Sequence, residues 1–222
     1  MFIEEIDGIS LQFETEAEPD VSGSPVIFSP GKIDTGTRAM LSCVSFENDD
    51  KVLDLGCGYG VVGIFAAKKI APENIVMCDI LQPAVQLARK NAETNGVRSD
   101  TSCGIKILCS DGFENISDRD FSLILSNPPY HTDFSVAKRF IEGGFAHLRV
   151  GGRMVMVTKR LDWYKNKLTS VFGGVKVTEI VGYYVFISEK RKKQRNNTVI
   201  NAAKNKNTLS RKLKRKINRE KA

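Results

Sequence analysis

The chain has 222 residues, of which 41% are hydrophobic, and this length fits one domain or at most two. It has no run of about 18 apolar residues and no basic and apolar leader, so we expect neither a transmembrane helix nor a signal peptide. The net charge is +7, and five cysteines without Cys-x-x-Cys spacing and two histidines argue against disulfides and a metal site, which favours a cytoplasmic protein.

The apolar pattern predicts strands that alternate with helices. Residues 2–6 and 9–13 are expected to form a hairpin, and the acidic residues 14–24 a loop. The expected strands of the main sheet are residues 51–55, 74–79, 105–109, 121–126 and 153–158, with a terminal antiparallel pair at 175–180 and 183–188. The expected helices are residues 35–46, 61–69, 83–95, 134–148 and 163–172. This order indicates an α/β fold in which helices cover both faces of a mostly parallel sheet.

A glycine-rich loop follows the first strand of the expected sheet. Asp54 precedes the loop, and Gly56, Gly58 and Gly60 follow at Gly-x-Gly-x-Gly spacing before a helix. Such glycines let the backbone turn tightly and approach a ligand. A nicotinamide-binding loop is spaced Gly-x-Gly-x-x-Gly, so this spacing favours another ligand. Asp79 ends the next strand, where an acid can hold ribose hydroxyls, although a helix-capping role is the alternative.

The sequence Ser-Asn-Pro-Pro-Tyr-His at residues 126–131 follows a short apolar strand. Each proline fixes φ and lacks an N–H, while its carbonyl can still accept a hydrogen bond. The Asn127 amide oxygen, the Pro128 carbonyl and the Tyr130 ring therefore suit a flat group that bears an NH₂. We predict that these three residues are catalytic; the alternative is a plain proline turn after a strand.

In these residues the chain resembles a Rossmann-like S-adenosylmethionine-dependent methyltransferase. Residues 52–60 match the first motif of that superfamily, Asp79 the acid on the ribose, residues 110–112 the adenine contact, and residues 127–130 the motif of enzymes that methylate exocyclic or amide nitrogens. The resemblance implies seven strands and S-adenosylmethionine as cofactor. The cofactor-binding residues it implies are Asp34, Thr37, Asp54, Gly56, Gly58, Gly60, Asp79, Ile80, Ser110, Asp111, Gly112 and Asn127.

A narrower resemblance concerns residues 28–38, which precede the first strand of the sheet. With Asp34, Gly36 and Thr37, this segment is similar to one that lies over the cofactor in bacterial rRNA guanine-N2 methyltransferases. Those enzymes often have Asn-Pro-Pro-Phe-His, where this chain has Tyr130 and keeps His131. Larger members carry a duplicated N-terminal domain for which this chain is too short, so its RNA contacts are expected elsewhere.

The C-terminal tail is the expected RNA-binding element. Residues 188–222 contain 14 Lys or Arg and 2 acids, a net +12, so residues 1–187 carry −5 of the chain's +7. Lys and Arg displace counterions from phosphates. The candidate RNA-binding residues are Lys192, Lys193, Arg195, Arg211, Lys212, Lys214 and Arg215. Residues 208–221 have a thin apolar stripe, which a basic helix that folds on RNA would show; a membrane-surface helix or a solvated tail is the alternative.

The domain prediction is an N-terminal extension at residues 1–25, a methyltransferase domain at 26–188 and a flexible basic tail at 189–222. The predicted function is methyl transfer to an exocyclic amine in RNA, with guanine N2 of ribosomal RNA preferred and ribosomal RNA or a ribosomal subunit as partner. Three alternatives stay open. These are methylation of adenine or of a protein glutamine, nicotinamide-dependent oxidoreduction, and a non-catalytic RNA-binding assembly factor.

Overall fold

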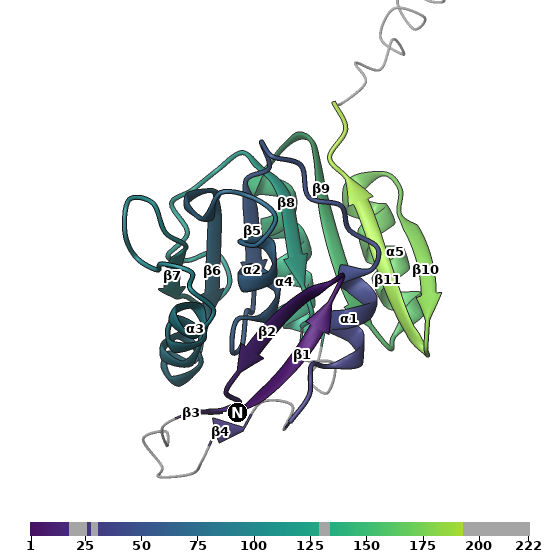
Figure 1. Ribbon diagram of the computed structural model, residues 1–222. Helices are drawn as coiled ribbons and strands as arrows, with labels where there is room; N and C mark the ends of the chain where they lie inside the picture. The colour runs from purple at the N-terminus through teal and green to yellow at the C-terminus, as the bar shows by residue number, and fades with distance from the viewer. Residues whose placement is uncertain (18–25, 28–30, 129–133, 193–222) are drawn as a thin grey trace, which may run out of the picture. The chain divides into compact units, whose positions relative to one another are not determined.

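The computed structural model describes residues 1–17, 26–27, 31–128 and 134–192. The chain divides between Arg191 and Lys192 into two units, and the architecture below belongs to Met1–Arg191 (Figure 1). None of the helices in these described ranges has both the length and the apolar character that a membrane span requires.

A seven-stranded sheet forms the centre of this unit, in the order β10-β11-β9-β8-β5-β6-β7. Its strands are β5 (Val52–Leu55), β6 (Ile75–Asp79), β7 (Lys106–Cys109), β8 (Phe121–Ser126), β9 (Leu148–Thr158), β10 (Lys176–Ile180) and β11 (Tyr183–Glu189). Strands β5 to β9 pair in parallel, and β11 runs antiparallel to both β9 and β10. The predicted mostly parallel sheet with an antiparallel hairpin at one edge is confirmed.

Helices cover both faces of the sheet because its strands are apolar on both faces. The helices are α1 (Thr35–Leu41), α2 (Val61–Ala66), α3 (Gln82–Thr94), α4 (Phe134–His147) and α5 (Leu161–Phe172), with a 3₁₀ turn at Pro72–Asn74. Val52 packs in the core shared with α1, α2 and α3, whereas Leu53 packs in the core shared with α4 and α5. Successive strand residues point to opposite faces, so one strand feeds two cores.

An N-terminal hairpin lies on the α1–α3 side of the sheet (Figure 1). It consists of β1 (Phe2–Ile6) and β2 (Ile9–Phe13), which confirms the predicted pair. Asp7 and Gly8 both have positive φ, 49° and 74°, as a two-residue type I′ hairpin turn requires. A hairpin of this size is only marginally stable alone, so its attachment to the domain matters.

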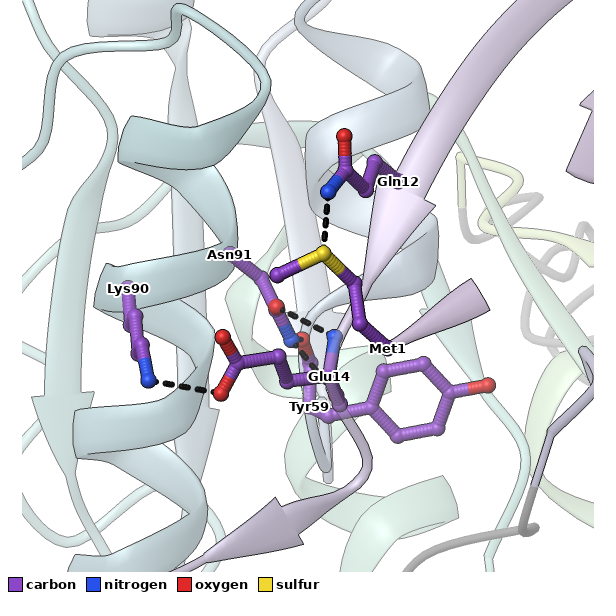
Figure 2. Close-up of polar contacts among 6 residues, drawn as sticks. All are labelled: Met1, Gln12, Glu14, Tyr59, Lys90 and Asn91. Carbon is purple, nitrogen blue, oxygen red and sulfur yellow. Dashed lines mark hydrogen bonds and ion pairs between the residues drawn. The ribbon is translucent and has the colours of Figure 1, made fainter. Parts of the chain in front are cut away.

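Two asparagines hold the end of this hairpin: Asn91 of α3, which Figure 2 shows, and Asn95, which follows the last residue of α3. The buried Asn91 amide donates to the Glu14 and Tyr59 carbonyls at 3.0 and 2.9 Å and accepts from the Glu14 N–H at 2.9 Å. Asn95 bonds both backbone groups of Gln12 in the same way. Because Tyr59 belongs to the glycine-rich loop, Asn91 joins the hairpin to that loop.

Several predicted boundaries were wrong. Helix α1 ends at Leu41 rather than 46, and α2 at Ala66 rather than 69, because the backbone changes there to three-residue turns. Strand β9 begins at Leu148, inside the predicted helix 134–148, and continues past a register shift opposite Phe121. The predicted loop at 14–24 contains a two-residue strand, β3 (Glu16–Ala17), which pairs with β4 (Val26–Ile27).

Candidate functional site

A cavity of about 660 Å³ lies at the carboxyl ends of the parallel strands. Its volume is in the range of small-molecule sites in proteins. Of the residues predicted from the sequence, its lining includes Asp34, Thr37, Asp54, Gly56, Gly58, Asp79, Ile80, Ser110, Asp111, Gly112, Asn127 and Pro128. Segments that are far apart in the chain therefore meet around one space. Gly60 does not line the cavity.

The glycine-rich loop turns over the end of β5. Gly56, Gly58 and Gly60 have φ of 76°, 55° and 99°, values that residues other than glycine rarely adopt. The Gly56 N–H donates to the Cys78 carbonyl at 2.9 Å, which continues the pairing of β5 with β6. Gly60 opens helix α2, and a Cβ there would lie 3.0 Å from the Ile64 and Met77 side chains. Gly60 is therefore required for close packing of the turn rather than for contact with a ligand.

Two carboxylates lie behind and beside this loop. Asp54 is 2% exposed, and its Oδ2 accepts from the Gly63 N–H at 3.0 Å. Burial raises the pKa of Asp54 to about 7, the Gly63 bond opposes that rise, and the nearby Asp79 adds to it. Asp79 accepts from the Gly58 N–H at 2.9 Å and from the Leu81 N–H at 3.0 Å, so it also shapes the loop.

The far side of the cavity combines polar loops with an aromatic side chain. The Ser110 hydroxyl donates to the Gly112 carbonyl at 3.0 Å, which folds the loop after β7. A Cβ at Gly112 would lie 3.4 Å from the Phe140 ring, and one at Gly56 would lie 3.6 Å from it. Phe140 thus packs against both loops, and Ile80, 59% exposed, adds an apolar surface to the lining.

The Asn127 side chain is held in one orientation. Its Nδ2 donates to Asp34 Oδ2 at 2.9 Å and to the Thr37 hydroxyl at 3.1 Å. A carboxylate can only accept, so the amide nitrogen has to face Asp34 and the amide oxygen faces the other way. Asp34 is itself fixed because it caps α1 through the Thr37 N–H at 3.1 Å. Asp34 and Thr37 therefore orient the predicted catalytic amide.

Helix α4 contributes residues that sequence reasoning missed. Val136, Arg139 and Phe140 line the cavity, and Arg139 forms an ion pair with Asp111 at 2.7 Å. Hydrogen bonding to Asp111 raises the pKa of the already basic Arg139. Residues 136, 139 and 140 have i, i+3, i+4 spacing and so share one helix face. This spacing was the sequence signal from which their common position could have been predicted. The lining also includes Leu55, Cys57, Tyr59, Val61, Val62, Cys78 and Leu81.

Some predicted residues cannot be compared with the structure. Tyr130, together with Pro129 and His131, lies outside the described residues, and so do Lys193, Arg195, Arg211, Lys212, Lys214 and Arg215. Lys192 is described and exposed, and it follows the end of β11. The cavity lies at the carboxyl ends of the parallel strands. Because β11 runs antiparallel to β9, the C-terminal end of β11 lies at the opposite end of the strands from the cavity.

The charge of the lining limits what the cavity can hold. Asp34, Asp54, Asp79 and Asp111 line it against one cation, Arg139, which is paired with Asp111. Such a lining disfavours the pyrophosphate of a nicotinamide cofactor because like charges repel. It suits a ligand with positive groups and hydroxyl donors. S-adenosylmethionine, with its sulfonium, ammonium and ribose hydroxyls, fits these acidic acceptors.

Comparison with known proteins points to one family. A family model described as methyltransferase small domain matches residues 18–188. The chain is 32% identical over 164 residues to ribosomal RNA small subunit methyltransferase C of Cronobacter sakazakii, which covers 72% of this chain and 46% of the relative. It is 33% identical over 153 residues to the protein of that description from Escherichia coli O1:K1, which covers 67% and 43%.

Solved structures agree with this similarity. The fold matches a T. thermophilus 16S rRNA N2 methyltransferase, solved in complex with AdoMet and guanosine, with a TM-score of 0.73 and 27% identity. That match covers 86% of this chain and 50% of the other. A ribosomal protein L11 methylase from Lactobacillus delbrueckii, at 18% identity and a TM-score of 0.61, shares the fold. The chain spans about half the length of the curated relatives it matches.

Proposed function

We propose, because this chain belongs to the methyltransferase small domain family, that it transfers a methyl group from S-adenosylmethionine to an exocyclic amine in RNA. The preferred acceptor is guanine N2 of ribosomal RNA, free or within a ribosomal subunit. The observation that carries this proposal is the oriented Asn127 amide beside an acid-lined cavity. The related rRNA methyltransferases, one of them solved with guanosine, support the acceptor class. Residues 26–188 are the catalytic domain in this proposal.

The cofactor would be held by the predicted cofactor-binding residues that line the cavity, apart from Asn127, whose amide serves the acceptor. Asp79 would accept from the ribose hydroxyls, and Ile80 and Phe140 offer apolar surfaces to the adenine. Gly56 and Gly58 leave room for close approach of the backbone. When bound, S-adenosylmethionine supplies a methyl group already activated by a positive sulfur.

The remaining chemistry belongs to the acceptor amine, whose lone pair is delocalised into its ring. The Asn127 oxygen and the Pro128 carbonyl would accept hydrogen bonds from the two N–H groups of the amine and so favour a pyramidal nitrogen. Partial positive charge develops on that nitrogen during transfer, so these acceptors stabilise the transition state more than the ground state. As the new N–C bond forms, the S–C bond breaks and would leave S-adenosylhomocysteine. The amine proton becomes acidic at the same time and can pass to water, so no dedicated base is required.

Access to such a site requires an unpaired base. A base within a duplex presents its amine inside the stack, so it has to be flipped out or lie in a loop or at an end. In this proposal Tyr130 stacks on the base, and the basic tail, including Lys192, binds phosphates elsewhere in the RNA.

The test is transfer of a labelled methyl group from S-adenosylmethionine by the purified full chain. The acceptors are naked ribosomal RNA and isolated ribosomal subunits from a strain that lacks the gene, followed by mass spectrometry of the nucleosides. The proposal predicts N2-methylguanosine at one position. N6-methyladenosine, or methylglutamine in a protein digest, would replace it with an alternative acceptor, and no labelled product would reject it.

A further inference from the structure

A second cluster of cations and aromatic rings lies, like the cavity, beyond the carboxyl ends of the parallel strands. The Phe134 and Trp163 rings stack at 4.3 Å with an interplanar angle of 11°. The Arg160 guanidinium lies over the Phe134 ring, 5.0 Å from its centroid. Phe134 begins α4, and Arg160 and Trp163 lie at the start of α5. Arg160 is exposed, and both rings are half-buried, so the stack is accessible.

A second cation–ring pair joins this stack to the Asn127 site. The Lys159 Nζ lies 4.8 Å from the centroid of the Tyr183 ring. A Cβ built on Gly36 would lie 2.7 Å from the Tyr183 ring and 2.9 Å from Asp34 Oδ2. The Tyr183 ring therefore packs beside the carboxylate that orients Asn127.

The register of the strands places Lys159 and Arg160 near Asn127 along the strand direction. Ser126 of β8 pairs with Met156 of β9, and Thr158 of β9 pairs with Tyr184 of β11. Lys159 and Arg160 follow Thr158 directly, just as Asn127 follows Ser126. The two cations therefore lie beyond the sheet on the side where Asn127 also leaves it.

Charge separates this cluster from the cavity. The cavity is lined by four aspartates and one paired arginine, so it disfavours phosphates. Lys159 and Arg160 lie outside that lining and are both exposed. The C-terminal end of β11, from which the basic tail continues, lies at the opposite end of the strands. An RNA strand whose target base reaches Asn127 thus meets these cations rather than the root of the tail.

We propose that Lys159, Arg160, Phe134 and Trp163 form an aromatic–cation rim that binds the nucleotides flanking the target base in single-stranded RNA, with the buried Tyr183 ring behind Lys159. The inference rests on the proposed function. Cations bind phosphates, and planar rings and guanidinium groups stack on bases, a combination typical of single-strand binding. A protein acceptor offers neither a regular row of phosphates nor planar bases, so the rim favours RNA.

Trp163 is the only tryptophan of the chain, so its fluorescence reports on this rim. The full chain, saturated with S-adenosylhomocysteine, is titrated with a small-subunit ribosomal RNA transcript, and in parallel with polyphosphate, which has charge but no bases. We expect RNA to quench Trp163 strongly. Polyphosphate can bind the cations but cannot stack, so it should cause a much smaller change. The double substitution Lys159→Ala/Arg160→Ala should reduce the quench and weaken RNA binding by about tenfold. Two lost phosphate contacts would make the slope of log K against log salt shallower by about 1.4.

The matched control is Lys176→Ala, an exposed lysine at the other end of the β10–β11 hairpin. It should bind and methylate RNA like the unmodified chain, whereas the double variant shows a raised KM for RNA. If the unmodified chain methylates RNA without any change in Trp163 fluorescence, or if the double variant behaves like Lys176→Ala, the rim is rejected and the methyltransferase proposal stands. If the unmodified chain neither binds nor methylates RNA, both are rejected.

Discussion

Replacing Asp54 by Asn should stabilise the protein at alkaline pH while it weakens cofactor binding. Burial raises the pKa of this carboxyl from 3.8 to about 7, so the folded state binds its proton more tightly than the unfolded state. The stability lost to ionisation therefore grows as pH rises from about 4 and is complete above about pH 7. At about 1.4 kcal/mol per pH unit, the loss reaches about 4 kcal/mol. Asn resembles the protonated acid and can still accept from the Gly63 N–H.

Urea denaturation of both proteins at pH 4, 5, 6, 7 and 8 measures this effect. The free energy of unfolding of Asp54→Asn should equal that of the unmodified chain near pH 4 and exceed it by up to about 4 kcal/mol at pH 8. Asp49→Asn, which changes a carboxylate that is 79% exposed, should show no such trend. A difference that does not vary with pH, or a variant less stable at pH 8, would refute the reasoning. Calorimetry at pH 8 should also show weaker binding of the cationic cofactor to Asp54→Asn.

Three further changes test other parts of the structure. Asn91→Ala leaves the partly buried backbone groups of Glu14 and the buried Tyr59 carbonyl without their partner, so the free energy of unfolding in urea should fall by about 2–3 kcal/mol; no loss would mean that the hairpin attachment is unimportant. Val181 has φ of 49° in the β10–β11 turn and is 79% exposed, so Val181→Asn should raise the same quantity by about 1 kcal/mol, and a lower value would argue against strain there. Removal of residues 193–222 should weaken RNA binding and flatten its salt dependence while circular dichroism stays unchanged; an unaltered salt titration would reject the tail as an RNA arm.

The fold could be predicted because each signal was local. Strand β5 is apolar on both faces, and Gly56, Gly58 and Gly60 with positive φ separate it from α2. The parallel arrangement then brings Asp54 and Asp79 to one edge of the sheet, so their common lining of the cavity could be anticipated. Boundaries were less predictable, since α1 and α2 both end in three-residue turns that the apolar pattern does not reveal.

The rest of the site depends on contacts between distant segments. The bond from Asn127 to Asp34 joins residues 93 positions apart, and only the packing of α1 against the sheet creates it. Arg139 and Phe140 look like ordinary helix residues until α4 packs beside the loops after β5 and β7. Asn91 looks like an ordinary polar residue on a helix, yet it is buried, and Glu14, which follows β2, and Tyr59 of the glycine-rich loop supply the backbone partners of its amide.

The most direct test of the central claim is to measure cofactor binding and methyl transfer on Asn127→Ala. If the oriented amide oxygen activates the acceptor amine, transfer to ribosomal RNA should fall by about 10²–10³-fold or more. Calorimetry should then give a dissociation constant for S-adenosylmethionine close to that of the unmodified chain. Unchanged transfer, or a loss of cofactor binding large enough to explain the lost transfer, would contradict the assigned role of Asn127.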